Sequence, residues 1–193
     1  ELREGRWHSN TFRSSARQLF GSTVGIIGFG RIGKQVAKRL IGFGTKTIYT
    51  DLLEMSPEIE AELKVTRVDI DTLLAESDFV SLHVPLTELT HHLIDEVALN
   101  KMKADATLIN CARGPVVSEV ALIAALKSGH IGGAGLDVFE VEPPAAPNPF
   151  ADFANVVLTP HHAPGTRDTM IVKFKEIFAN ADRFFNGERM ENE

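Results

Sequence analysis

The sequence has very little cysteine and no long apolar segment. Cys111 is the one cysteine among 193 residues, which excludes an internal disulfide framework and a zinc site of the CxxC kind. No stretch approaches the roughly 18 consecutive apolar residues of a membrane-spanning helix. Residues 1–6 are polar and lack the apolar core of a signal peptide. We therefore expect a cytoplasmic protein, and the single thiol fits a reducing compartment.

Basic residues are in the minority. Lys and Arg number 20 against 26 Asp and Glu, which gives a net charge of −6, and no run of basic residues interrupts this balance. Nucleic acid and anionic membrane surfaces are therefore disfavoured as partners. What the sequence does contain, 44% hydrophobic and 24% charged residues, is the composition of a globular domain. A chain of this length buries a core without cross-links.

Short apolar runs alternate with segments of helical periodicity from Thr23 onward. We predict strands at 23–27, 46–50, 78–83, 106–111, 131–138 and 155–158. We predict helices at 31–41, 69–77, 118–128 and 166–185, with shorter helical pieces near Pro57 and within 90–102. This alternation is typical of βαβ units, and it predicts a doubly wound parallel sheet with helices on both faces.

The chain divides into one domain with a tail on each side. Residues 1–20 form an N-terminal arm or linker, 21–187 the domain, and 188–193 a C-terminal tail. Aromatic side chains at Trp7, Phe12 and Phe20 stand among the charges of the arm. They indicate a contact with another copy of the chain, and the alternative is that the arm packs on its own domain.

A glycine-rich motif follows the first predicted strand. Residues 28–33 read G-F-G-R-I-G and open the first predicted helix. Asp51 follows the next strand, 23 positions after Gly28, where about 20 are typical of dinucleotide-binding folds. Gly28, Gly30 and Gly33 would let the backbone approach a pyrophosphate at a helix N-terminus. Asp51 would accept a hydrogen bond from a ribose 2′-hydroxyl and repel a 2′-phosphate, which favours NAD over NADP. The alternative is a glycine turn without a ligand.

Three further segments place reactive side chains directly after predicted strands. They are N-C-A-R-G at 110–114, D-V-F-E-V-E-P at 137–143 and L-T-P-H at 158–161. The carboxyl ends of parallel strands meet at one edge of a sheet, and ligands bind at that edge. We therefore expect these side chains to lie close together.

With these segments the chain resembles the NAD-binding domain of the D-isomer-specific 2-hydroxyacid dehydrogenases, which include phosphoglycerate, glycerate and D-lactate dehydrogenases. The resemblance runs from Gly21 to Asn186. It rests on the glycine motif, S-L-H-V-P at 81–85 and the segments 110–114, 133–143 and 159–161, in family order. It implies a Rossmann-type fold and NAD-dependent hydride transfer between a D-2-hydroxy acid and its 2-keto acid. Phosphoglycerate, glycerate or hydroxypyruvate, glyoxylate and D-lactate all remain open as substrates.

The resemblance assigns the chemistry to three residues. Arg113 is the arginine that binds the substrate carboxylate, Glu142 the acid that supports the histidine, and His161 the proton donor or acceptor. Histidine suits this step because its pKa lies near neutrality, and arginine offers a planar fork for a carboxylate. Glu140 competes with Glu142 for the supporting role. Alignment of the V-F-x-x-E-P residues favours Glu142.

The same resemblance distributes cofactor contacts over the chain. It implies that Arg31 and Ile32 contact the pyrophosphate and that Val84, Pro85 and Thr90 flank the adenosine side. It also implies that Cys111, Ala112 and Asp137 hold the nicotinamide ring and its amide. Cys111 has no evident base beside it, so we interpret it as a small apolar filler. We expect no metal, because adjacent histidines such as those at 91–92 rarely point the same way.

The family also has a second domain that closes over the substrate, and we expect this chain to lack it. Alone, the chain should then bind NAD and turn over slowly or not at all. The resemblance further implies a homodimer through this domain. Pro164 departs from the family pattern after His161. A non-enzymatic NAD sensor like the corepressors that share this fold stays open, whereas a homocysteine-releasing hydrolase lacks the order of the three catalytic residues.

Overall fold

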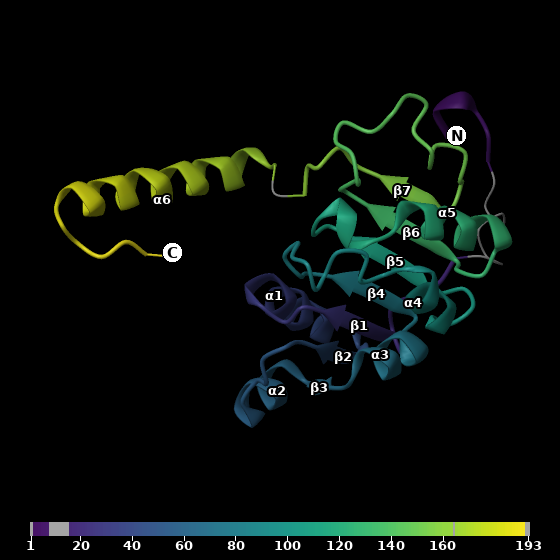
Figure 1. The fold of residues 1–193 in the computed structure, drawn as a ribbon, viewed down its shortest axis with the longest axis horizontal. Coiled ribbons are helices and arrows are strands. Elements are labelled where there is room, and N and C mark those ends of the chain that lie inside the picture. The colour runs from purple at the N-terminus through teal and green to yellow at the C-terminus, as the bar shows by residue number, and fades with distance from the viewer. Residues whose placement is uncertain (1, 8–15, 164, 192–193) are drawn as a thin grey trace.

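A parallel sheet forms the centre of the computed structural model, which describes residues 2–7, 16–163 and 165–191. Within these residues the sheet has seven strands in the order β3-β2-β1-β4-β5-β6-β7, and each neighbouring pair is parallel (Figure 1). The strands are β1 (Thr23–Ile27), β2 (Lys46–Thr50), β3 (Val65–Arg67), β4 (Phe79–Leu82), β5 (Thr107–Asn110), β6 (Gly133–Leu136) and β7 (Val156–Leu158). The order reverses between β1 and β4, which is where ligands bind in such sheets.

Helices connect the strands, and four of them begin at a residue that caps the first turn. The α-helices are α1 (Arg31–Leu40), α2 (Pro57–Leu63), α3 (Ile70–Glu76), α4 (Glu96–Lys101), α5 (Glu119–Ser128) and α6 (Arg167–Phe185). Short 3₁₀ helices are η1 (Leu2–Glu4), η2 (Ile41–Phe43) and η3 (Gly114–Val116). Asp69, Asp95, Ser118 and Thr166 each accept a hydrogen bond from a backbone N–H of the helix that follows. These caps satisfy donors that would otherwise be unpaired.

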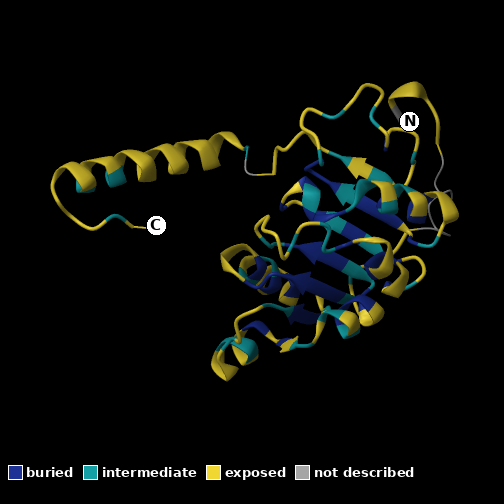
Figure 2. Ribbon diagram, in the orientation of Figure 1, coloured by how far each residue is buried: buried dark blue, intermediate teal, exposed yellow. Residues whose placement is uncertain are grey.

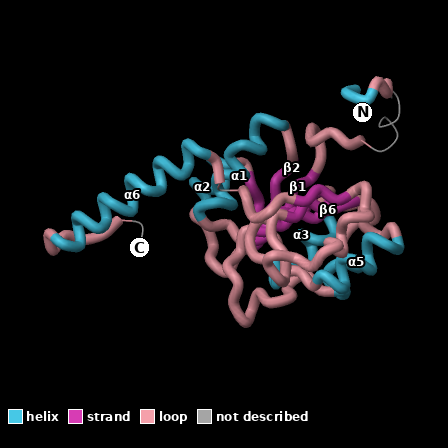
Figure 3. The backbone as a smooth tube through the Cα atoms, turned by 90° about the horizontal axis from the view of Figure 1, so that it is seen from above, coloured by secondary structure: helices cyan, strands magenta, loops and turns pink. Residues whose placement is uncertain are grey.

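Two hydrophobic cores lie on opposite faces of the sheet, whose central strands are buried (Figure 2) and which has helices on both sides (Figure 3). On one face α3, α4 and α5 bury Leu73, Leu99 and Leu122 in a large cluster. On the other face α1 and α2 bury Ala37 and Leu63 against the first half of the sheet. The predicted doubly wound sheet with helices on both faces is therefore confirmed.

Two local differences separate the predicted elements from the observed ones. Strand β3 was not predicted, because three residues are too few to show an alternating pattern. Only Glu96–Lys101 is helical within 90–102. The preceding residues form a turn that Thr90 closes, with its Oγ1 donating to the Pro85 carbonyl at 2.6 Å. Ile94 then forms an isolated bridge with Val117.

The last helix and the arm lie at the margins of the domain. α6 leads away from the sheet (Figure 1), and none of its residues is buried. Its bounds confirm the predicted long helix. In the arm Trp7 is 75% and Phe20 71% exposed, and the Phe20 ring lies against Gly44. Phe12 lies outside the described residues. Among the residues with described positions, no helix has both the length and the apolar character required to cross a membrane.

The close contact between α3 and β1 yields a test of the packing. A methyl group on Gly25 would overlap the Ser77 hydroxyl and the buried Leu73 side chain. We expect Gly25→Ala to lower the free energy of unfolding by about 1–3 kcal/mol, as overpacking does. Gly42→Ala is the matched control, because nothing lies within 4 Å of a methyl group there. Urea denaturation of both variants measures the difference, and equal stability of the two would contradict the packing argument.

Candidate functional site

The three glycines of the motif have different surroundings. Gly28 has a φ of +92°, and a methyl group there would meet the backbone of His83 and the side chain of Val84. A methyl group on Gly33 would overlap the carbonyl oxygen of Gly28. Gly30 differs, because nothing lies within 4 Å of its methyl position. Gly28 and Gly33 thus permit close packing of β1, β4 and α1, while Gly30 leaves open space in front of the helix.

That open space lies at the N-terminus of α1. Gly30 is the N-cap residue, and no side chain caps the helix. The first-turn residues Arg31 and Ile32 are exposed beside it. Backbone N–H groups at a helix N-terminus favour an anion, and a pyrophosphate fits an opening without a Cβ. The residues present therefore fit a dinucleotide.

Asp51 stands beside this loop, as predicted. Its Oδ2 accepts from the Phe29 N–H at 2.5 Å and its Oδ1 from the Leu53 N–H at 2.9 Å. Arg67 donates to the Asp51 carbonyl oxygen at 3.0 Å. The carboxylate therefore has a structural role in the glycine loop, and its place at the end of β2 also puts a negative charge next to the open helix terminus.

A buried aromatic pair supports the loop from below. The rings of Phe29 and Tyr49 stack with their centroids 4.1 Å apart. The Tyr49 hydroxyl donates to Glu60 of α2 at 2.7 Å. Burial, followed by this carboxylate, raises the pKa of Tyr49 to about 12. The glycine loop thus packs on a stacked, uncharged aromatic pair, which sequence reasoning missed.

Val84, Pro85 and Thr90 lie on the neighbouring side of the glycine loop. Val84 lies against Gly28, so the structure brings these two predicted cofactor residues together. Pro85 is exposed, and Thr90 closes the turn that carries it. Thr90 Oγ1 also accepts from the Thr87 N–H at 2.8 Å. This segment therefore forms a preformed wall at the ends of β1 and β4.

The loop after β5 is shaped by Asn110, whose side chain is buried. Its amide nitrogen donates to the Arg113 carbonyl at 3.0 Å, and its Oδ1 accepts from the Ala112 N–H at 3.0 Å. This turn buries Ala112 and exposes Cys111. The interpretation of Cys111 as an apolar filler is therefore wrong. Partial burial and the nearby Asp137 raise the pKa of its thiol, which agrees with the inference that it is no nucleophile.

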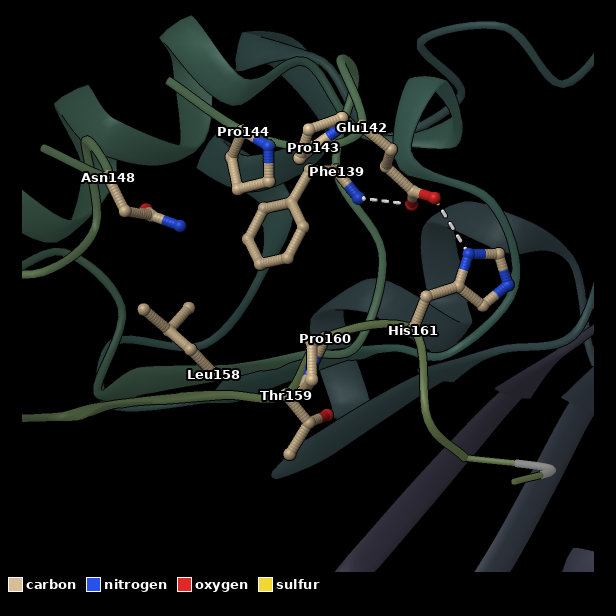
Figure 4. A pocket seen from close by; sticks show the side chains of 9 residues that line it. All are labelled: Phe139, Glu142, Pro143, Pro144, Asn148, Leu158, Thr159, Pro160 and His161. Carbon is tan, nitrogen blue, oxygen red and sulfur yellow. Dashed lines mark hydrogen bonds and ion pairs between the residues drawn. The ribbon is translucent and has the colours of Figure 1, made fainter. Parts of the chain in front are cut away.

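His161 and Glu142 form the pair that the sequence predicted. Nδ1 of His161 lies 2.7 Å from Oε2 of Glu142, and the other oxygen, Oε1, accepts from the Phe139 N–H at 3.0 Å (Figure 4). The hydrogen bond from His161, followed by that of Phe139, lowers the pKa of Glu142. A carboxylate only accepts hydrogen bonds, so Nδ1 carries the hydrogen and Nε2 is the nitrogen left open to other partners.

The charge of Glu142 has a pH dependence of known sign. Because its pKa is lower in the folded chain, the pair contributes stability above the ordinary carboxyl pKa. That contribution is lost as the pH falls through the lowered value. The side chains of His161 and Glu142 are 45% and 35% exposed, so solvent screens the interaction, and the pair's effect on stability is modest.

Asp137 is buried and fixes the loop that carries His161. Its Oδ1 accepts from the Thr159 hydroxyl at 2.5 Å and the His162 N–H at 2.8 Å, and its Oδ2 from the Ala163 N–H at 2.9 Å. Burial by itself would raise the pKa of Asp137, but these hydrogen bonds outweigh it and lower the pKa. Its carboxylate is thus engaged within the protein, a role that the sequence did not indicate. Pro164 lies outside the described residues.

The backbone at His161 is unusual. Its φ is +51°, a backbone conformation that residues other than glycine rarely adopt and that recurs at functional sites. The His161 N–H donates to the Asp137 carbonyl at 2.7 Å. The bonds to Asp137 from residues on both sides of His161 therefore hold its backbone in a conformation that is uncommon in a free loop.

Arg113 belongs to the same neighbourhood. It is exposed, its Nη1 donates to the Ala112 carbonyl at 2.6 Å, and its charge contributes to the lowered pKa of Glu142. The segment after it packs tightly, because a methyl group on Gly114 would overlap the Phe139 backbone. The structure therefore brings Arg113, Glu142 and His161 together at the carboxyl ends of β5, β6 and β7.

A hollow of about 330 Å³ lies next to the acid–base pair. It is lined by Phe139, Glu142, Pro143, Pro144, Asn148, Leu158, Thr159, Pro160 and His161. Figure 4 shows the imidazole of His161 turned away from Phe139 and Leu158. The hollow thus borders the pair on the side of the proline-rich segment and leaves Nε2 facing outward.

Comparison with known proteins shows to which family the chain is similar. The model for the NAD binding domain of D-isomer specific 2-hydroxyacid dehydrogenases matches residues 1–163. A glyoxylate reductase of Korarchaeum cryptofilum is 45% identical over 189 residues, which are 97% of this chain and 57% of that protein. The chain spans about half the length of the curated relatives it matches.

Solved structures similar to this chain include two D-2-hydroxyacid dehydrogenases. The apo D-mandelate dehydrogenase of Rhodotorula graminis has a TM-score of 0.89 at 38% identity, with 98% of this chain and 57% of that chain covered. D-lactate dehydrogenase of Lactobacillus jensenii, solved with NAD⁺, has a TM-score of 0.85 at 33% identity, with 98% and 60% covered. The chain therefore belongs to the D-isomer specific 2-hydroxyacid dehydrogenases and is an NAD-binding domain of that family.

Proposed function

We propose that this domain serves an enzyme that interconverts a D-2-hydroxy acid and its 2-keto acid, with Arg113, Glu142 and His161 as the catalytic residues. The observation that carries the proposal is the 2.7 Å contact between His161 Nδ1 and Glu142 Oε2, at the same sheet edge as the glycine loop. Glyoxylate is the first substrate to test, because the Korarchaeum relative is a glyoxylate reductase. A second, substrate-closing domain, a homodimer and a cytoplasmic location stay predictions.

His161 supplies the proton chemistry. When bound, the NAD cofactor exchanges a hydride with C2 of the substrate. In the direction of reduction, protonated His161 donates its Nε2 hydrogen to the C2 oxygen and becomes neutral, while its other hydrogen stays on Nδ1 and is donated to Glu142. In the direction of oxidation, neutral His161 accepts the hydroxyl proton at Nε2. The negative charge of Glu142 stabilises the imidazolium and fixes which nitrogen reacts.

Arg113 binds the substrate carboxylate. Its guanidinium is a planar fork of donors that matches a carboxylate in two hydrogen bonds. Asn110 fixes the backbone from which Arg113 projects, through its contact with the Arg113 carbonyl. The substrate is thus oriented by a group on the β5 loop and protonated by a group on the β7 loop.

Cofactor binding yields the first test of function. A methyl group on Gly30 would enter the open space that we assign to the pyrophosphate. We expect Gly30→Ala to weaken NADH binding by at least about tenfold, which corresponds to ~1.4 kcal/mol. Its cost to stability, from the altered N-cap, should stay within about 1 kcal/mol. Fluorescence titration with NADH measures the affinity. Gly42→Ala is the control, and NADH affinity of Gly30→Ala equal to that of this control would contradict the assignment.

Cofactor selectivity tests the role of Asp51. Asp51→Asn keeps one acceptor oxygen, for the Phe29 N–H, gives up the acceptor for the Leu53 N–H and removes the negative charge. The charge repels a 2′-phosphate, so we expect the ratio of NADPH to NADH affinity to rise by about tenfold, on the order of one screened charge interaction. Parallel titrations with both nucleotides provide the measurement. Asp71→Asn, at an exposed surface ion pair with Lys101, is the control, and an unchanged ratio in Asp51→Asn would rule out this role.

The acid–base assignment is tested with the polypeptide encoded by the full gene. We expect His161→Gln to lower the rate of glyoxylate reduction by about 10²–10⁴-fold, the usual contribution of general acid–base catalysis, and to leave NADH binding intact. His162→Gln is the matched control, because its backbone N–H still reaches Asp137. If the two variants reduce glyoxylate equally well, His161 is not the proton donor. If the wild-type polypeptide binds NADH but reduces no 2-keto acid, the NAD-sensor alternative is favoured instead.

A further inference from the structure

A second glutamate lies two residues before Glu142 and makes a separate set of contacts. Oε1 of Glu140 accepts from the backbone N–H of Glu119 at 2.8 Å. In return, Oε1 of Glu119 accepts from the backbone N–H of Glu140 at 2.8 Å. The two residues therefore clamp the 139–142 loop to the first turn of α5, where the free N–H groups and the helix dipole favour a carboxylate.

His92 completes this cluster. Its Nε2 lies 3.1 Å from the same Oε1 of Glu140, and its backbone N–H donates to the Pro115 carbonyl at 2.8 Å. Its φ of +49° shows that this position is also held in an uncommon conformation. His92 follows the turn closed by Thr90, so the cluster joins the cofactor wall at 84–90 to the loop that carries Glu142.

The position of Glu142 depends on this clamp. The segment between Phe139 and Glu142 is fixed at Phe139, whose N–H binds Oε1 of Glu142, and at Glu140, whose backbone and side chain both bind Glu119. Val141, between the two glutamates, is 70% exposed and provides no packing. Without Glu140, the contact between Glu142 and His161 would depend on the Phe139 N–H, on the packing of Gly114 against the Phe139 backbone and on His161 itself.

We propose that Glu140, with Glu119 and His92, is a positioning residue that holds Glu142 in register with His161 and links this pair to the cofactor wall. Glu140 reaches the helix terminus and His92, while Glu142 is the acid in contact with His161. The inference rests on the proposed function, and it adds residues that act through Glu142 and touch neither substrate nor cofactor.

The contacts distinguish a positioning role from a role of charge. Both bonds of the Glu140 side chain end on one oxygen, and both partners are donors. A glutamine at 140 offers the same acceptor oxygen, whereas a leucine offers none. Glu140→Gln should therefore retain function and Glu140→Leu should lose it. Glu142→Gln should be defective, because a neutral amide does not stabilise an imidazolium.

The experiment compares Glu140→Leu, Glu140→Gln and Glu142→Gln in the polypeptide encoded by the full gene. We expect Glu140→Leu to lower kcat for glyoxylate by up to about 100-fold, as sub-ångström to 1 Å misplacement of catalytic groups does. Glu140→Gln should stay within about threefold of wild type, a change equivalent to ~0.65 kcal/mol. The matched control is Glu76→Leu. Glu76 forms an exposed ion pair with Lys46, the first residue of β2, at the edge of the sheet opposite to the candidate site.

A second readout uses this chain itself and needs no turnover. The ¹⁵N chemical shifts of the His161 ring report whether Nδ1 still donates to Glu142, and hydrogen exchange of the 139–142 amides reports whether the loop is held. Glu140→Leu should lose both signatures, and Glu140→Gln should retain them. If Glu140→Leu does not fold, Glu119→Ala and Glu119→Gln probe the same clamp from the helix side.

The outcomes separate the two proposals. Wild-type ring shifts and kcat in Glu140→Leu would overturn the positioning role, as would a Glu140→Gln variant as defective as Glu140→Leu. Failure of the wild-type polypeptide to reduce any 2-keto acid would instead overturn the proposed function. In that case the ring shifts and exchange rates would still decide whether Glu140 positions Glu142.

Discussion

The carboxylate of Asp137 determines where the candidate site lies. It is buried at the end of β6, where an unpaired charge would be costly, and it accepts hydrogen bonds from Thr159, His162 and Ala163. These donors belong to the segment after β7, so satisfying the buried charge also folds that segment back over the sheet edge. His161 lies within it and takes a positive φ as a result. Asp137 thus fixes the backbone from which the imidazole projects, and the bond from Nδ1 to Glu142 then orients the ring.

A parallel sheet makes this arrangement possible. Strands β1, β4, β5, β6 and β7 all end at one edge, so the glycine loop and the loops that carry Arg113, Glu142 and His161 meet although they are up to about 130 positions apart in the chain. Close backbone approach keeps the loops in contact. Gly28 lies against the backbone of His83, and Gly114 against that of Phe139. The site is therefore built from rigid strand ends, and its loops add little freedom of their own.

The sequence predicted the parts of the fold that depend on local pattern. Apolar runs and caps located most strands and helices, and the glycine motif and Asp51, predicted to share one edge of the sheet, lie beside each other there. The pairing of His161 with Glu142 was predicted by resemblance. Strand β3 was missed because three residues carry no period. The exposure of Cys111 was missed because the turn at Asn110, set by two side-chain hydrogen bonds, decides which of the next two residues is buried.

Glu140 and Glu142 show most clearly why such details need three dimensions. Both are acids in one exposed loop, and their spacing of two gives no reason for one to reach the histidine and not the other. Two distant features decide the outcome. Gly114 lets the Phe139 backbone approach closely, and the Phe139 N–H donates to Oε1 of Glu142. The Glu119 N–H in the first turn of α5 binds Glu140 in the other direction. Neither the N-terminus of α5 nor Gly114 is adjacent in sequence to the two glutamates, yet these features give two chemically equal residues different contacts.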